Sequence, residues 1–287
     1  MPLVSIKEML NNALKRKYAV GQFNINSLEF AQAFLQAAKE ENSPVILGIT
    51  EVAAENMGGV KLIALMVQEL IEKYQVQVPV ALHFDHSSSY EKCVEAMYVG
   101  FSSVMIDGSH HPLEQNIALT QKVVDVAKVL GVSVEAEMGR ITGEEDGIVV
   151  DECEGTYAVP KECEKFVRET GVDCFAPAIG TVHGPYKGEP NLRFDLLAEI
   201  MQRTGVPLAL HGGTDIPNDY IKKAISLGIA KINVNTENQI VFATAVRKVL
   251  TEQPDLYDLR KYVGSAREAV KDSVKRKMRE FGSSGQA

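Results

Sequence analysis

Short hydrophobic runs alternate with amphipathic stretches along the whole chain. The runs are rich in valine, isoleucine and alanine, and they predict buried β-strands at residues 19–25, 44–50, 79–84, 103–107, 132–138, 174–179, 207–210 and 231–234. Between them, apolar residues recur three and four positions apart, as in residues 27–41 and 61–74, and this spacing predicts helices. A further helical pattern at residues 265–280 follows the last predicted strand.

Eight strand–helix units follow one another without a linker rich in proline or serine, which favours a closed (β/α)8 TIM barrel of the α/β class. An open, doubly wound sheet is the alternative. The 287 residues, 45% of them hydrophobic, suffice for one barrel. We therefore expect a single domain over residues 1–287, including a C-terminal helical tail from about residue 258 that packs outside the barrel.

The charge of the chain narrows the class of ligand. A net charge of −8 argues against nucleic-acid binding, because a phosphate backbone requires concentrated lysine and arginine. No run approaches the roughly 18 apolar residues that cross a bilayer, and the first residues lack the pattern of a secretory signal. The four cysteines form no CxxC pair. We expect a cytoplasmic protein with small-molecule ligands and neither nucleic-acid nor membrane partners.

Histidines lie directly after several predicted strands. The carboxyl ends of barrel strands share one face, on which catalytic groups gather. His86, His183 and His211 follow three different strands, and three imidazoles plus an open position are the composition of a catalytic zinc site. Taken alone, each histidine is also compatible with the role of a hydrogen-bonded polar residue at the barrel rim. We expect His83 to be structural, and His110 and His111 to open the fourth helix as capping or surface residues.

Carboxylates accompany these histidines. Asp85 adjoins His86 and suits either a proton donor or a residue that orients a metal ligand. Asp107 and Glu137 can accept hydrogen bonds from the histidines or bind a metal themselves. The acidic residues 144–146 lie between two glycines, in a segment that is either a solvated turn or a mobile catalytic loop.

A phosphate site is indicated by glycine and by a helix start. Gly212, Gly213 and Thr214 follow the seventh predicted strand, and residues 233–236 open the helix after the eighth. In many barrels, backbone N–H groups and a helix N-terminus at this place bind phosphate. Lys187, three residues after Gly184, can add a cation.

Five ordered motifs resemble those of class II fructose-bisphosphate aldolases, in particular the short enzymes of Bacillus-like bacteria. They are VALHFDH at residues 80–86, VEAEMG at 134–139, GTVHGPYKGEP at 180–190, LHGGT at 210–214 and KINVNTE at 231–237. The resemblance covers essentially the whole chain. It implies reversible retro-aldol cleavage of fructose 1,6-bisphosphate to dihydroxyacetone phosphate and glyceraldehyde 3-phosphate, a step of glycolysis and gluconeogenesis.

The resemblance also implies roles for particular residues. His86, His183 and His211 would bind Zn²⁺, with Asp107 and Glu137 in an alternative or second metal position. Asp85 would exchange the proton of the C4 hydroxyl and Glu145 the proton at C3. The implied substrate-binding residues are Thr50, Gly184, Lys187, Gly212, Gly213, Thr214, Asn233, Val234, Asn235, Thr236 and Arg260.

Further implications concern ions and assembly. A monovalent cation, K⁺ or Na⁺, would lie near the phosphate site. Arg260 would reach the distal phosphate in a neighbouring subunit, which implies a homodimer or homotetramer. The chain departs from the family pattern at Thr50, Phe84, Asp215 and residues 140–142.

The implied chemistry has a physical basis. Cleavage of the C3–C4 bond leaves a carbanion, and zinc stabilises the resulting enediolate by polarising the C2 carbonyl. A Schiff base would need a lysine at the barrel mouth, but the sixth predicted strand ends without one and we expect Lys231 at the opposite rim.

Other functions remain open. Relatives with this scaffold act on tagatose 1,6-bisphosphate or on 6-phospho-5-dehydro-2-deoxygluconate. From different classes, a non-catalytic barrel that binds a sugar phosphate and a metal-dependent phosphatase are both compatible with these residues.

Overall fold

The computed structural model describes residues 3–145, 148–151, 155–186 and 188–287. Eight parallel strands close into a barrel in the order β1–β11–β10–β8–β5–β4–β3–β2, which confirms the (β/α)8 fold. The barrel strands are β1 (Val20–Asn24), β2 (Val45–Thr50), β3 (Val80–Ser87), β4 (Ser103–Ile106), β5 (Ser133–Met138), β8 (Cys174–Pro177), β10 (Leu208–Leu210) and β11 (Ile229–Val234).

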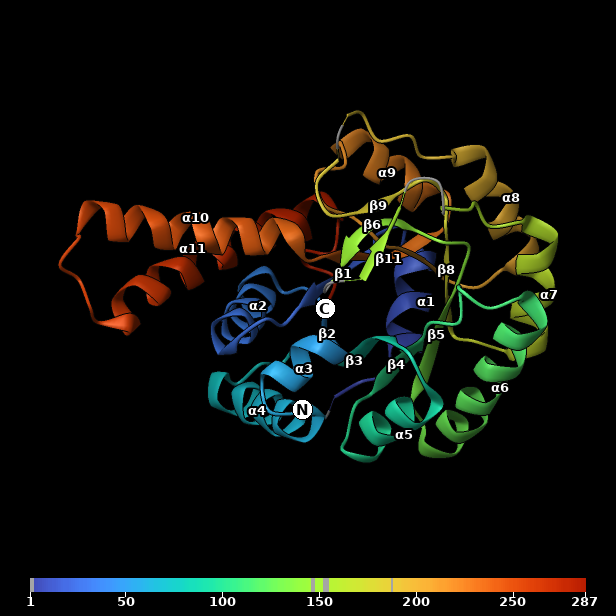
Figure 1. Ribbon diagram of the computed structural model, residues 1–287, viewed down its shortest axis with the longest axis horizontal. Coiled ribbons are helices and arrows are strands. Elements are labelled where there is room, and N and C mark those ends of the chain that lie inside the picture. Colours follow the sequence, from blue (N-terminus) through green and yellow to red (C-terminus); the bar gives the residue numbers. More distant parts are fainter. Residues whose placement is uncertain (1–2, 146–147, 152–154, 187) are drawn as a thin grey trace.

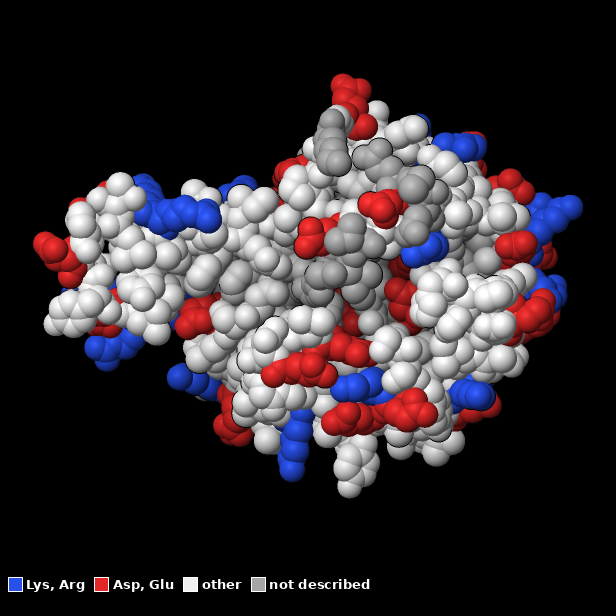
Figure 2. Space-filling model, viewed as in Figure 1, with Lys and Arg blue, Asp and Glu red and all other residues white. Residues whose placement is uncertain are grey.

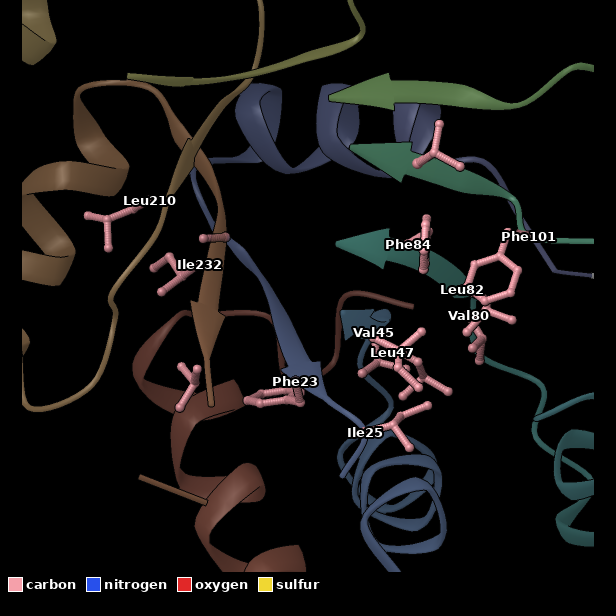
Figure 3. Packing of buried hydrophobic residues seen from close by; sticks show 14 of the residues in the cluster. Phe23, Ile25, Val45, Leu47, Val80, Leu82, Phe84, Phe101, Leu210 and Ile232 are labelled. Atoms are coloured by element: carbon pink, nitrogen blue, oxygen red, sulfur yellow. The ribbon is translucent and has the colours of Figure 1, made fainter. Parts of the chain in front are cut away.

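Helices surround the barrel and connect its strands (Figure 1). They are α2 (Leu28–Glu41), α3 (Glu51–Asn56), α4 (Val60–Tyr74), α5 (Tyr90–Tyr98), α6 (Leu113–Leu130), α7 (Pro160–Thr170), α8 (Phe194–Thr204), α9 (Asn218–Ser226) and α10 (Thr236–Glu252). Their apolar faces pack on the outward side chains of the strands. Figure 3 shows part of this layer, including Phe23, Leu47 and Phe84.

Side chains along each strand alternate between this outer layer and the barrel interior, since successive residues of a strand point to opposite faces. In β1, Phe23 packs on Phe34 of α2, whereas Gln22 and Asn24 belong to the buried polar residues of the interior. The same alternation in β3 brings His83 and Asp85 inward and Phe84 outward.

Two strands differ from the sequence prediction in ways that affect the site. β3 continues to Ser87, three residues beyond the predicted end, so that Asp85 and His86 belong to the strand. β11 begins at Ile229, two residues before the predicted start. Lys231 is therefore an interior residue of the strand, fully buried, and our expectation that it lies at the opposite rim is wrong.

Helix α1 (Ile6–Arg16) closes the barrel at the N-terminal ends of the strands. The Val4 N–H donates to the carbonyl of Val80, the first residue of β3, and the Ile6 N–H donates to Ser133 Oγ, at the start of β5. The apolar face of α1 packs on small interior residues such as Ala81 and Ala209. This end of the barrel is thereby a closed apolar floor.

The acidic segment that we expected to be a loop forms a small second sheet. Strand β6 (Thr142–Glu145) pairs antiparallel with β7 (Ile148–Val150) and parallel with β9 (Val182–His183). The hairpin of β6 and β7 is therefore attached to the segment that carries His183.

Helix α11 (Leu259–Glu280) begins six residues earlier than the predicted helix. As expected, it packs outside the barrel, against α2 and α10. The far ends of α10 and α11 project from the barrel as a two-helix arm (Figure 1). In the described part of the chain, no helix combines the length and the apolar character that a membrane span requires.

Candidate metal centre and substrate cavities

Three histidine rings meet at the carboxyl ends of the strands. One ring nitrogen from each of His86, His183 and His211 lies within 4.8 Å of the other two. His86 Nε2 and His211 Nδ1 are 2.9 Å apart. Three imidazoles at this spacing are the donor set of a catalytic zinc site, so the residues present fit a divalent metal.

The backbone of His86 is unusual for a strand residue. Its φ is 46°, a left-handed value that residues with a Cβ rarely adopt. The register between β3 and β4 shifts at this point, between Phe84 and Ser87. Such an irregularity redirects a side chain that would otherwise continue the alternation. Here it brings Asp85 and His86, adjacent in sequence, to the same interior.

Two carboxylates contact the histidine rings at the nitrogens that face away from the centre. Asp107 Oδ2 lies 2.9 Å from His86 Nδ1, and Glu135 Oε1 lies 2.8 Å from His211 Nε2. Each contact leaves the opposite ring nitrogen facing the centre, which is how outer carboxylates commonly prepare metal-binding histidines. Glu137 lies nearer the centre, with Oε2 3.5 Å from His211 Nδ1. His86, Asp107 and Glu137 form a second group whose ligand atoms lie within 4.8 Å of one another.

Glu135 is in turn held by Lys231, deep inside the barrel. Lys231 Nζ lies 2.9 Å from Glu135 Oε2 and donates to Asn233 Oδ1 at 2.8 Å. Burial disfavours both charges, but their mutual attraction outweighs it. The pKa of Glu135 is consequently well below its usual range and that of Lys231 is raised. Lys231 is therefore a paired ammonium group rather than a free amine.

Asp85 lies below the histidines and is fully buried. Its Oδ2 accepts from Gln22 Nε2 at 2.7 Å and from Asn24 Nδ2 at 3.0 Å. Burial by itself raises the pKa of Asp85, but attraction to His86 and to the Lys231 ammonium outweighs this and lowers the pKa to about 2. The carboxylate is therefore charged at neutral pH, and it lines neither of the two cavities described below.

His83 is buried among these charges. Its Nδ1 lies 2.7 Å from Ser103 Oγ, and its Nε2 lies 3.7 Å from Asp85 Oδ1. Burial, followed by the charge of Lys231, lowers the pKa of His83 to about 4. The ring is therefore neutral at physiological pH, in keeping with the structural role that we expected.

Our sequence analysis did not assign roles to Gln22, Asn24, Glu135 and Lys231. A signal for them exists: each is a polar residue in an otherwise hydrophobic run, and each has a second polar residue two positions away. In a barrel strand this spacing places both side chains in the interior. The partners that they select there depend on the closure of the barrel.

His183 lines a cavity of about 410 Å³, the first cavity. It contains many residues of the predicted phosphate site, and its lining comprises Glu144, His183, Gly184, Pro185, Gly212, Thr214, Asn233, Asn235, Thr236 and Gln239. Because α10 begins at Thr236, the N-terminus of that helix lies at this cavity.

The Gly212 turn sets the shape of the first cavity. Its φ is 67°, and a Cβ there would lie 2.1 Å from the carbonyl oxygen of Val182, so only glycine fits. The hydroxyl of Tyr186 accepts from the Val182 N–H and donates to the carbonyl of Gly212, at 3.3 Å each. This partly buried phenol, whose pKa burial raises to about 12, fixes the turn against β9.

Some predicted substrate-binding residues do not line the first cavity. Gly213 donates its N–H to the carbonyl of Asn233, and the side chain of Val234 is buried in the hydrophobic core. Arg260 lies on the arm, at the start of α11, where it pairs with Asp258 and is 89% exposed. Lys187 lies outside the described residues.

A second cavity has a volume of about 340 Å³. His86 and His183 both line it, so it opens on the same centre. Thr50 lines it as well and caps α3 by accepting from the Ala53 N–H. The remaining lining residues are Glu51, Val52, Ser88, Asp107, Ser109, His110, Glu137, Arg140, Ile141 and Val150.

His110 and His111 are surface residues, as expected, but they precede helix α6 rather than open it, because the helix begins at Leu113 after Pro112. Their rings stack with centroids 3.9 Å apart, and both side chains are exposed. Proline at the cap position, with its fixed φ, ends the preceding turn and starts the helix after the histidines.

The acidic segment reaches both cavities. The exposed side chain of Glu144 lines the first cavity, and Val150 of β7 lines the second. The backbone of Glu145 ends β6, but its side chain lies outside the described part of the structure. The hairpin thus contributes to the lining of both cavities.

Two departures from the family pattern lie away from the histidines. Phe84 packs edge-on against Phe101 in the outer layer, with ring centroids 5.8 Å apart (Figure 3). Asp215 is exposed, with a φ of 56°, and does not line the first cavity. On the face that Figure 2 shows, basic side chains are scattered among acidic ones rather than gathered into a patch.

Comparison with known proteins agrees with this geometry. The family model described as fructose-bisphosphate aldolase class-II matches residues 4–286. A fructose-bisphosphate aldolase of Geobacillus stearothermophilus is 59% identical over 100% of this chain and 99% of its own length. That of Staphylococcus aureus is 58% identical over the full length of both chains. The crystal structure of the YdjI aldolase from Escherichia coli K12 superposes with a TM-score of 0.87, at 35% identity and 99% coverage of each chain. The chain therefore belongs to the class II fructose-bisphosphate aldolases, a family of carbon–carbon lyases.

Proposed function

We propose that the chain catalyses the reversible cleavage of fructose 1,6-bisphosphate into dihydroxyacetone phosphate and glyceraldehyde 3-phosphate. The observation that carries the proposal is a group of three imidazoles with two cavities that both reach it, one lined by His183 and the other by His86 and His183. This arrangement suits a substrate that is cleaved in the middle and carries a phosphate at each end. The names of the relatives from Geobacillus stearothermophilus and Staphylococcus aureus support this sugar.

His86, His183 and His211 would hold a zinc ion. When bound, zinc supplies a Lewis acid that polarises the C2 carbonyl of the ketose. Asp107 and Glu135 keep the rings of His86 and His211 oriented, so that one nitrogen of each faces the centre. Asp107 and Glu137 supply carboxylates for an alternative metal position.

The first cavity would bind the phosphate of the dihydroxyacetone half. The N-terminus of α10 and the backbone of the Gly212 turn offer N–H donors, which suit a phosphate better than a neutral group. A monovalent cation, K⁺ or Na⁺, would help to balance the phosphate charge. The buried Val234 and Gly213 would contribute to the shape of this cavity through the backbone alone, and Lys187 would add a cation.

Two acids would move the protons. During cleavage, Asp85 takes the proton of the C4 hydroxyl as the C3–C4 bond breaks, and Glu145 delivers a proton to C3. A pKa of about 2 keeps Asp85 in the charged form that accepts a proton at neutral pH. Condensation of the two trioses reverses both transfers.

The assembly would complete the site. Arg260 is at the start of α11, on the projecting arm (Figure 1), and lines neither cavity of its own chain, which suits a role in the site of a neighbouring copy. We propose a homodimer or homotetramer in which each arm reaches the site of another subunit. The chain would act as one barrel unit over residues 1–287, as a cytoplasmic enzyme of glycolysis and gluconeogenesis.

A coupled triose-phosphate assay tests the proposal. Fructose 1,6-bisphosphate, tagatose 1,6-bisphosphate and 6-phospho-5-dehydro-2-deoxygluconate are compared, each with and without a chelator. We expect the highest kcat/KM for the fructose sugar and loss of activity with chelator. Preference for another sugar would mean that this sugar, rather than fructose 1,6-bisphosphate, is the substrate. Release of inorganic phosphate would indicate a phosphatase. Binding without turnover would indicate a non-catalytic barrel.

Proton exchange tests the role of Glu145. With dihydroxyacetone phosphate alone, Glu145→Gln should abolish exchange of the C3 proton with solvent, whereas Glu144→Gln, the matched neighbour, should do much less. Zinc content and phosphate binding should change little in both variants. Equal exchange rates for wild type and Glu145→Gln would remove Glu145 from the mechanism.

A further inference from the structure

The second cavity differs from the first in the charges of its lining. Its lining contains three carboxylates, Glu51, Asp107 and Glu137, and the apolar residues Val52, Ile141 and Val150. A phosphorylated group that enters it meets repulsion from these acids, because like charges at short range are unfavourable. A cation in the lining offsets this repulsion if the cavity accepts an anion.

Arg140 supplies that cation. Among the described residues that line either cavity, it is the only lysine or arginine. An arginine presents a planar set of N–H donors that matches two oxygens of a phosphate, and it stays charged at all relevant pH values. The position is also one at which the chain departs from the family pattern.

The backbone of Arg140 is fixed at the end of β5. Arg140 pairs with Thr156 in both directions, N–H to carbonyl, at 3.1 Å each. The preceding Gly139 has a φ of 82°, and a Cβ there would lie 2.6 Å from Ala178 Cβ and 2.7 Å from the Thr156 carbonyl oxygen. Only glycine allows this tight turn, which brings the next residue from the strand end to the wall of the second cavity.

The path of the substrate connects these features. If dihydroxyacetone phosphate occupies the first cavity, the bond to be cleaved lies at the histidines. The aldehyde half then extends into the second cavity, which shares His183 with the first. This step rests on the proposed function.

We propose that Arg140 binds the distal phosphate of the substrate from within the same chain and thereby sets the preference for phosphorylated over neutral aldehydes. Arg140 acts from within its own chain, whether or not Arg260 of a neighbouring copy also reaches the phosphate. In the condensation direction, the group bound is the phosphate of glyceraldehyde 3-phosphate.

Condensation kinetics with a matched pair of aldehydes test this proposal. Dihydroxyacetone phosphate is combined with D-glyceraldehyde 3-phosphate or with D-glyceraldehyde, which differ only in the phosphate. In Arg140→Ala, the ratio of kcat/KM for the phosphorylated aldehyde to that for the neutral one should fall roughly tenfold to hundredfold, the usual value of a charged hydrogen-bonded pair. The change should appear mainly in KM for glyceraldehyde 3-phosphate.

Two further variants sharpen the result. Arg140→Lys keeps the charge without the planar donors and should give an intermediate ratio. Arg203→Ala removes an exposed arginine on α8, where it pairs with Glu164 and Glu199, and should leave the ratio unchanged. Zinc content and thermal unfolding report whether each variant is folded, and Arg140→Lys serves as the test if Arg140→Ala is not.

The two proposals fail in different ways. An unchanged ratio in both Arg140 variants, in an enzyme that still condenses both aldehydes, would overturn the role of Arg140 alone. A wild-type enzyme that condenses neither aldehyde would overturn the proposed function itself.

Discussion

The two ends of the barrel interior are filled by side chains of opposite character, although the same strands supply both. Near the floor, the inward residues of β1, β2 and β3 are Val20, Ile46 and Ala81, which pack with α1. Two residues further along β1 and β3 come Gln22 and His83, followed by Asn24 and Asp85. Along these strands, a distance of two residues therefore separates the hydrophobic layer from the charged layer.

The apolar floor and the charged upper layer constrain residue identity to different degrees. The apolar floor needs only the correct volume, because apolar contacts are non-directional. In the upper layer, each buried charge requires a particular partner, as Glu135 requires Lys231 and His211. An unpaired charge in such a place is costly, so this layer constrains residue identity far more strongly. Substitutions that remove one group from each layer distinguish the two.

The largest effect should come from Asp85→Asn in the upper layer. We expect cleavage to fall by ~10²–10⁴-fold while zinc is retained, because the amide cannot accept the proton. Asp173→Asn at the floor end, where Asp173 accepts from the Val134 N–H, is the matched control and should keep near-normal activity. Steady-state kinetics and zinc analysis measure both. If Asp85→Asn loses its metal but keeps intrinsic turnover, Asp85 is a residue that orients His86.

Lys231→Met should destabilise the fold by ~3–5 kcal/mol, since it leaves Glu135 charged, buried and unpaired. Zinc affinity should also fall by ~10–100-fold, because Glu135 orients His211. The control is Lys7→Met, which breaks the pair of Lys7 with Asp173 near the floor. That lysine is 63% exposed, so the cost should be under ~1 kcal/mol. Urea unfolding and zinc titration measure these changes, and equal costs for the two lysines would contradict the comparison.

In the floor, Leu10→Ala should cost ~2–5 kcal/mol of unfolding free energy, since Leu10 is fully buried against the strand residues below the site. Activity of the folded fraction and zinc affinity should stay at wild-type values. Denaturant unfolding gives the stability, and kinetics well below the unfolding midpoint give the activity. A large loss of zinc affinity would mean that the two layers are coupled.

The smallest effect concerns the stability of the fold at acidic pH. Because the pKa of His83 is lowered to about 4, the unfolded chain binds more protons than the fold between about pH 6.5 and pH 4. His83 therefore contributes stability that is present above pH 6.5 and is lost as the pH falls towards 4, by at most roughly 3 kcal/mol. In chelator, His83→Gln should flatten this part of the stability profile, whereas the exposed His111→Gln should not. Parallel profiles for the two variants would refute this.

Local sequence patterns determined much of this protein. Short hydrophobic runs predicted all eight barrel strands, and helical hydrophobic patterns predicted the helices between them, because burial leaves a trace in the order of apolar residues. The same patterns placed His86, His183 and His211 at strand ends that share one face, and the motifs around them carried the family.

Other features were decided only by the tertiary structure. Lys231 and Glu135 are 96 residues apart, and their strands β11 and β5 are separated in the barrel by β10 and β8, so their pairing across the interior depends on closure of the barrel. The left-handed backbone of His86 arises where β3 and β4 shift register, which no local pattern records. The hairpin of β6 and β7 exists because β9 offers it an edge, and Arg140 meets the second cavity because of the turn at Gly139. Periodicity tells which face a side chain takes, whereas its partner is chosen by strands that are distant in sequence and meet only when the barrel closes.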